Sequence, residues 1–79
     1  MVYPKAAKDS KIEGKVIVRF YVDYDGSIGD ATVVSNTPDI LNQSALNGLK
    51  KMPKWNPGKE DGEPIRVYFT LPILFKLNE

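Results

Sequence analysis

The chain has 79 residues, of which 11 are basic and 10 acidic, and its net charge is +1; this length is enough for one domain with a modest core. It contains no cysteine and no histidine, which excludes disulfides, thiolate or imidazole metal sites and a histidine general base. The charges are interspersed, which argues against a nucleic-acid-binding face. No apolar run is long enough to cross a membrane, and no signal peptide is evident at Met1.

The N-terminal part predicts a short helix followed by a β-hairpin. Pro4 suits the first turn of a helix that ends before Gly14. Apolar residues then recur at every second position, which is typical of a half-buried strand, and they are Val16, Val18, Phe20 and Val22. Asp25-Gly26 tolerates positive φ and favours a tight hairpin turn. A second strand is expected over residues 27–35, with Ile28, Ala31, Val33 and Val34 as its apolar residues.

The C-terminal part predicts one amphipathic helix and a long final strand. Thr37, Pro38 and Asp39 have the order of an N-cap, a first helical residue and an acidic first turn. The apolar stripe of this helix consists of Leu41, Ala45, Leu46, Leu49 and Met52. Residues 56–64 are polar and rich in Gly and Pro, so we expect a loop there. The last strand carries one unbroken apolar face, made of Ile65, Val67, Phe69, Leu71, Ile73 and Phe75.

The order helix, strand, strand, helix, strand predicts an α+β fold with a three-stranded antiparallel sheet. A right-handed crossover places the third strand beside the first, so the strand order is 2-1-3 and both helices cover one face. Pro72 supports an edge position for the last strand, because proline has no N–H for a ladder bond.

Pro72 also predicts which main-chain groups of the last strand are free. The N–H and C=O of one residue point to the same side of an antiparallel strand, and that side alternates along the chain. If Pro72 faces the unpaired side, the free donors belong to Arg66, Tyr68, Thr70 and Leu74. An added strand would then dock mainly on residues 66–70.

The sequence shows no residue set for catalysis or for metal binding. Residues 23–26, Asp-Tyr-Asp-Gly, resemble the start of a calcium loop, but the further oxygen ligands are missing, so a turn is favoured. Ser10, Ser35 and Ser44 have no histidine to activate them. We therefore expect a protein that is not an enzyme and needs neither cofactor nor metal.

The aromatic residues allow two interpretations each. Trp55, beside Pro57, is expected to close the core rather than to stack on a ligand. Tyr21 and Tyr68 are expected to form a pair across neighbouring strands on the face without helices, with contact to a partner as the alternative.

Five motifs in order, covering nearly the whole chain, resemble the C-terminal domain family of TonB energy transducers. They are Tyr3-Pro4 with Ala7, Ile12-Glu13-Gly14-Lys15-Val16, Phe20-x-Val22-x-x-Asp25-Gly26, Ala45-Leu46 with Trp55-x-Pro57-Gly58, and Pro72-Ile73-x-Phe75-Lys76-Leu77. The last motif looks like the variant common in the Bacteroidetes phylum.

The resemblance implies that residues 1–79 form a single periplasmic domain, cut from a longer protein anchored in the inner membrane. Such domains bind the TonB box, a short extended segment of outer-membrane transporters, by adding it to the sheet as a strand. An inner-membrane motor complex then uses the proton-motive force to drive uptake of siderophores, vitamins or glycans.

The resemblance also assigns residues to partner binding. The box-pairing edge is matched by Arg66, Val67, Tyr68, Phe69, Thr70 and Leu71. Lys8 matches a position near the box that is Gln in enterobacterial members. Pro72 departs from the enterobacterial pattern and should shorten the pairing.

Two alternatives stay open. The domain could be an accessory module of a multi-helix membrane sensor or metallopeptidase-type protein, which the sequence upstream of Met1 would distinguish. It could also be a TolA-like envelope module, although that domain usually relies on disulfides. An exposed edge further allows two copies of the chain to pair as a homodimer.

Overall fold

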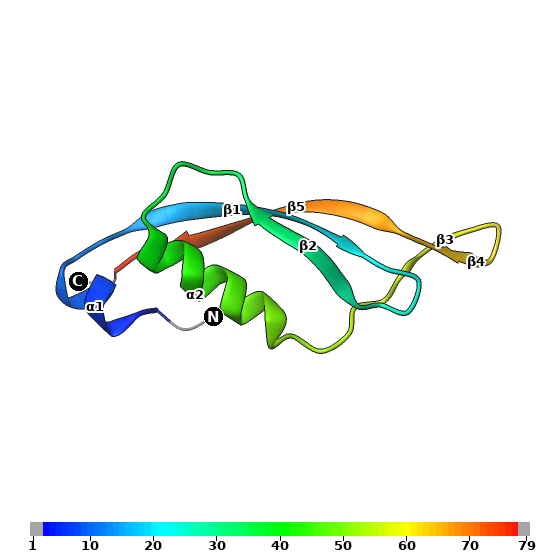
Figure 1. Cartoon of the computed structure of the whole chain (residues 1–79), viewed down its shortest axis with the longest axis horizontal. Coiled ribbons are helices and arrows are strands. Elements are labelled where there is room, and N and C mark those ends of the chain that lie inside the picture. Colours follow the sequence, from blue (N-terminus) through cyan, green and yellow to red (C-terminus); the bar gives the residue numbers. More distant parts are fainter. Residues whose placement is uncertain (1–2, 78–79) are drawn as a thin grey trace.

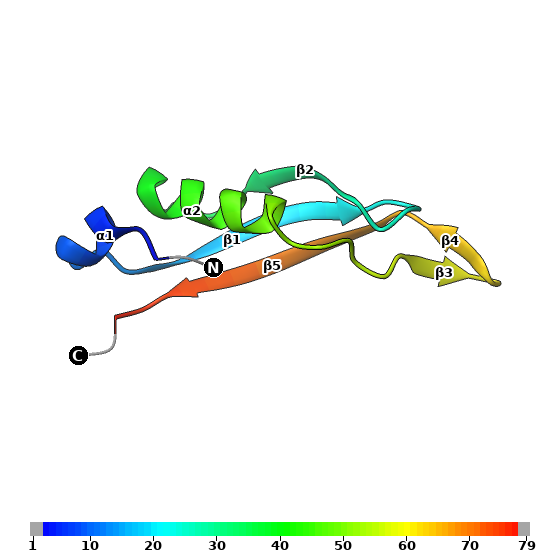
Figure 2. The ribbon, with the colours of Figure 1, turned by 90° about the horizontal axis from the view of Figure 1, so that it is seen from below.

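The computed structural model describes residues 3–77 as a sheet with two helices on one face (Figures 1 and 2). The sheet has the order β2-β1-β5, and both neighbouring pairs are antiparallel. Its strands are β1 (Gly14–Val22), β2 (Ile28–Val33) and β5 (Val67–Phe75), and the helices are α1 (Lys5–Asp9) and α2 (Asp39–Lys50). The predicted α+β class and the order 2-1-3 are confirmed.

The core lies between α2 and the helix side of β1. The predicted apolar row of β1 is fully buried, together with three residues of the α2 stripe and one residue each of α1 and β5; these are Ala7, Val16, Val18, Phe20, Val22, Leu41, Ala45, Leu49 and Phe75. Met52 was predicted in the stripe, but it is 38% exposed because α2 ends at Lys50. Trp55 packs against this core as predicted.

Both helices begin one residue later than predicted. Pro4 and Pro38 are N-caps with an extended backbone, and neither cap has a side-chain hydrogen bond. The carbonyl of Pro38 accepts the first helical N–H groups, those of Leu41 and Asn42. Thr37, predicted as the cap, instead donates its hydroxyl to the amide oxygen of Asn42 at 2.5 Å. Proline thus supplies the extended residue before the helix rather than its first turn.

Strand β2 contains a bulge that the sequence prediction missed. The pairing with β1 shifts by one residue between Arg19 and Tyr21, where Asp30 has a φ of 50°. This extra residue turns Ile28, Ala31 and Val33 toward the core, although their spacing does not fit a regular alternation. Val34 was predicted in a strand over residues 27–35, but it follows the strand and is 52% exposed.

A second small sheet replaces the predicted loop over residues 56–64. Strands β3 (Gly58–Glu60) and β4 (Glu63–Ile65) form a hairpin that projects beyond the end of the main sheet where β5 begins (Figure 1). Asp61 and Gly62 both have positive φ, 51° and 80°, as a two-residue hairpin turn requires. Ile65 therefore belongs to β4 rather than to the last strand. No helix within residues 3–77 is long and apolar enough to cross a membrane.

Candidate strand-pairing edge

Within residues 3–77, one side of β5 has no neighbouring strand along its whole length. β5 pairs with β1 over nine consecutive residues, from Val67 opposite Val22 to Phe75 opposite Gly14, without a bulge. Its other side is an edge of the sheet, because the strand order ends with β5. We call this side the β5 edge.

The hydrogen bonds of Ile17 show which groups of β5 face this edge. Its carbonyl accepts the Val34 N–H at 2.9 Å, and its own N–H donates to the Ser35 hydroxyl at 2.9 Å. Both main-chain groups of Ile17 therefore point toward β2, away from β5. Pro72 is opposite Ile17, so the main-chain groups of Pro72 point away from β1.

The alternation predicted from Pro72 is thus confirmed within β5. Tyr68, Thr70 and Leu74 present both N–H and C=O to the β5 edge, and Pro72 presents only its C=O. The intervening residues face β1. Between Val67 and Pro72, the edge therefore offers two complete donor–acceptor pairs.

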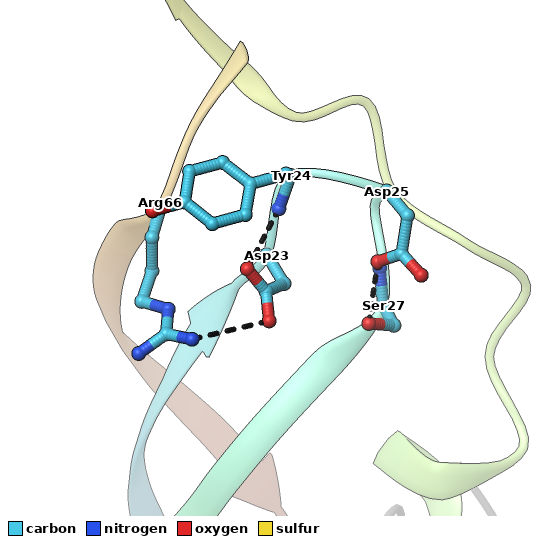
Figure 3. Close-up of polar contacts among 5 residues, drawn as sticks. All are labelled: Asp23, Tyr24, Asp25, Ser27 and Arg66. Atoms are coloured by element: carbon cyan, nitrogen blue, oxygen red, sulfur yellow. Dashed lines mark hydrogen bonds and ion pairs between the residues drawn. The ribbon is translucent and has the colours of Figure 1, made fainter.

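Arg66 lies just before β5, and its side chain is held by the first hairpin. Its Nη2 is 3.3 Å from Oδ2 of Asp23 (Figure 3). Its guanidinium also lies 4.2 Å from the centre of the Tyr21 ring. The pKa of the Arg66 guanidinium is raised, mainly by the hydrogen bond to Asp23 and next by a hydrogen bond to Tyr68. The contacts of Arg66 fix the start of β5 against the β1–β2 turn.

The turn between β1 and β2 holds Asp23 in place. The Asp23 carbonyl accepts the Gly26 N–H at 2.9 Å, and its N–H donates to the Ser27 carbonyl at 2.8 Å. Only Gly26 has a positive φ in this turn, and the loop of the predicted tight hairpin has three residues. Asp25 accepts hydrogen bonds from the Ser27 hydroxyl and N–H, at 2.6 and 3.0 Å, which lower the Asp25 pKa (Figure 3). Both carboxylates also reach beyond the turn, since Asp23 binds Arg66 and Asp25 lies 3.8 Å from Nζ of Lys54.

On the helix side of the β5 edge, Phe69 is part of an aromatic group. The ring centres of Phe69 lie 5.9 Å from Phe20 and 6.0 Å from Trp55, and those of Phe20 and Trp55 are 5.3 Å apart. Phe69 is nevertheless 41% exposed, because α2 packs over β1 and β2 and leaves β5 uncovered (Figure 2). The edge therefore has an apolar helix side.

On the open side, which carries no helix, the predicted aromatic pair is confirmed. The Tyr21 and Tyr68 rings meet edge to face at 5.6 Å, and Tyr68 is 61% exposed. The next pair along the strands, Arg19 and Thr70, lies on the same side.

Lys8 is separated from the other predicted partner-binding residues. It is exposed on α1, which lies near the end of the sheet where β5 finishes (Figure 1). The Tyr3 and Phe75 rings, 5.4 Å apart, join these two segments. Residues 66–70 lie toward the other end, so the structure brings residues 66–71 together but not Lys8 with them.

Comparison with known proteins gives the family. Residues 1–77 match the family described as Gram-negative bacterial TonB protein C-terminal. The chain belongs to this family. It is 42% identical over 78 residues to Protein TonB of Helicobacter pylori, a match that covers 98% of this chain and 26% of that protein. Identity to Protein TonB of Vibrio cholerae is 36% over 76 residues, covering 95% and 31%.

The fold of this TonB C-terminal domain also agrees with a solved relative. The solution structure of the Helicobacter pylori TonB C-terminal domain aligns with a TM-score of 0.72 and 38% identity, covering 99% of this chain and 82% of that one. The chain spans about a quarter to a third of the length of the curated relatives that it matches.

Sequence reasoning named Arg66 but missed the contacts that fix the start of the edge. Asp23 and Arg66 are 43 positions apart, and Gly26 accepts a hydrogen bond at its carbonyl from the Trp55 N–H at 2.9 Å. No periodicity links such distant residues. The two-residue turn at Asp61-Gly62, in contrast, had a local signal in its residue types.

Proposed function

We propose that this domain binds an extended segment of a partner protein by adding it as a strand at the β5 edge. The observation that carries the proposal is the nine-residue edge with two complete, outward-facing donor–acceptor pairs at Tyr68 and Thr70. Main-chain hydrogen bonds give affinity for extended segments with little demand on sequence. The edge therefore suits a domain that serves several partners.

The other edge of the sheet is less suited to the same role. β2 has six residues, and the bulge at Asp30 interrupts its alternation. Bulges and short lengths are features that discourage strand pairing at an edge. β5 has neither of these features, and its interruption at Pro72 falls after the two complete pairs.

The proposed contact extends over residues 68–71. Tyr68 and Thr70 bond the segment, while Phe69 and Leu71 contact its side chains on the helix side. Arg66 and Val67 set the start of the edge, since Arg66 is tied to Asp23 and Val67 lies against Gly58. Lys8 would contact only a segment that continues along β5 past Pro72.

The partner that family membership favours is the TonB box of an outer-membrane transporter. In this proposal the domain works in the periplasm as the C-terminal part of a longer transducer, anchored in the inner membrane and driven there by a motor complex. Capture of the box would couple that motor to uptake of siderophores, vitamins or glycans. The free edge would also support a homodimer if two copies paired through β5.

The test is amide chemical-shift mapping of the isotope-labelled domain, titrated with synthetic TonB-box peptides from transporters of the same organism. We expect shifts concentrated at Tyr68 and Thr70 and weaker changes on β2. A panel of such peptides that leaves the β5 amides unchanged at millimolar concentration would contradict the proposal and favour the role of an accessory module.

A further inference from the structure

The two sides of the β5 edge differ in chemistry, and this difference bears on what the edge selects. On the helix side, Phe69 is 41% exposed and Leu71 and Ile73 are half-buried, so the edge is apolar there. An apolar side chain beside Phe69 would cover ring surface that α2 leaves open. A segment added to β5 therefore gains from apolar residues at every second position.

On the open side, Arg19 of β1 is the cation in register with the centre of the edge. It is opposite Thr70, and its side chain is directed to the open side, since its neighbours Val18 and Phe20 are buried on the helix side. Thr70 is short and exposed, so it leaves the space above β5 open at this pair. Arg19 is thus one strand away from the edge with only a small side chain between.

Arg19 forms no ion pair in the part of the chain that the structure describes. Within residues 3–77, no carboxylate lies within 4.0 Å of its guanidinium. Asp23 is bound by Arg66 at 3.3 Å, so this acid is already paired. Asp30 and Arg19 line the same shallow hollow of about 260 Å³ without forming an ion pair.

The other cations on the open side are less well placed. Arg66 is occupied by Asp23 and by the Tyr21 ring. Lys15 is opposite Leu74, beyond Pro72, where the edge has lost a donor. Among residues 3–77, Arg19 is therefore the cation beside the two complete donor–acceptor pairs that forms no ion pair.

Building on the proposed strand addition, we propose that the captured segment carries a carboxylate on the open side, opposite Thr70, and that Arg19 binds it. Neighbouring strands lie about 4.8 Å apart, so the segment runs about 10 Å from β1. Arg19 and a glutamate side chain, extended toward each other across Thr70, span this distance. Apolar residues on either side of the glutamate would lie on the helix side, beside Phe69 and Leu71.

The test uses two peptides, blocked at both ends, that differ by one charge. The first is Gly-Thr-Val-Glu-Val-Thr-Gly and the second has Gln in place of Glu. Both read the same in either direction, so neither presupposes a parallel or an antiparallel strand. Each is titrated at low ionic strength against the wild type, Arg19→Gln and the control Lys15→Gln, and binding is followed by the Tyr68 and Thr70 amide shifts.

We expect the wild type and Lys15→Gln to bind the Glu peptide about two- to five-fold more tightly than the Gln peptide, a typical effect of one exposed ion pair. Arg19→Gln should bind both peptides equally, and high salt should remove the preference. Strand addition would stand, but the role of Arg19 would be overturned, if the edge amides shift and Arg19→Gln prefers the Glu peptide as strongly as the wild type does. The same holds if the edge amides shift and the wild type shows no preference between the two peptides. Absence of edge shifts with these peptides and with the TonB-box peptides would overturn both proposals.

Discussion

Thr70→Pro tests the β5 edge directly, because it removes a main-chain donor that faces outward and none that pairs with β1. Thr70 and Pro72 are two residues apart in an unbroken register, so their main-chain groups point the same way. The native strand already accommodates a proline at position 72. At Thr70, φ must move from about −140° toward −65°, so we expect the free energy of unfolding to fall by about 1–2 kcal/mol.

The effect on binding should be larger than the effect on stability. Loss of the Thr70 N–H removes one hydrogen bond to the segment, with a net contribution of about 0.5–1.5 kcal/mol. It also leaves a carbonyl of the segment without a partner, at a cost of about 1–3 kcal/mol. The sum is about 1.5–4.5 kcal/mol, so peptide affinity should fall by about 10-fold or more.

Two matched variants separate the edge from the fold. Thr70→Val keeps the N–H and the side-chain shape, so it should bind within about three-fold of the wild type. Leu71→Pro removes a donor that faces β1, so it should lower the free energy of unfolding by about 2–4 kcal/mol and the melting temperature by about 10 °C or more. Affinity is measured by amide-shift titration and stability by thermal unfolding. If folded Thr70→Pro binds the peptides as tightly as the wild type, the β5 edge is not the binding site.

Three further changes test the features that hold this edge. Gly26→Ala should lower the free energy of unfolding by about 2–4 kcal/mol in urea titration, because a Cβ there would lie 2.1 Å from the Trp55 carbonyl oxygen. The control Gly62→Ala should lower it by only about 1 kcal/mol, because Gly62 has a similar φ and a Cβ there would meet no atom within 4 Å. Asp25→Asn should destabilise the domain at about pH 6 and much less at about pH 2.5. The pKa of Asp25 is lowered in the folded state, so its carboxylate stabilises the fold above the unfolded-state pKa, and this stability is lost as the pH falls through the folded-state pKa. An equal effect at both pH values would contradict the role of the carboxylate. Pro72→Val restores an outward N–H, so it should increase self-association in sedimentation equilibrium without loss of stability, and a monomer as stable as the wild type at all concentrations would contradict this.

Much of the sheet could be predicted because its strands have one buried side. The alternation in β1 and β5 reflects a sheet covered by helices on one face only, which imposes a period of two. Pro72 then gave the edge and the direction of the free donors, since one missing N–H fixes the parity of the whole strand. These inferences needed only local chemistry.

The remaining features depend on contacts or on short elements. The bulge at Asp30 changes the side on which Ile28 lies relative to Val33, and a two-residue period cannot describe that shift. Strands β3 and β4 have three residues each, too few for a periodic signal. The pairing of Arg19 with Thr70 emerges only from the register, so no pattern in the sequence points to Arg19.

The position of Pro72 favours capture of a segment over pairing of two copies. A segment that meets Tyr68 and Thr70 loses no hydrogen bond to Pro72. In a two-fold antiparallel β5–β5 pairing long enough to include Pro72, each copy lacks one donor, so two hydrogen bonds are lost and two carbonyls stay unpaired. At about 1 kcal/mol for each lost bond, with a further cost for each unpaired carbonyl, a self-pairing that includes Pro72 would be weakened, whereas the proposed pairing with a short segment over residues 68–71 would not. Pro72 therefore limits the length of any pairing at this edge, and it penalises an extended self-pairing more than the proposed capture of a short segment.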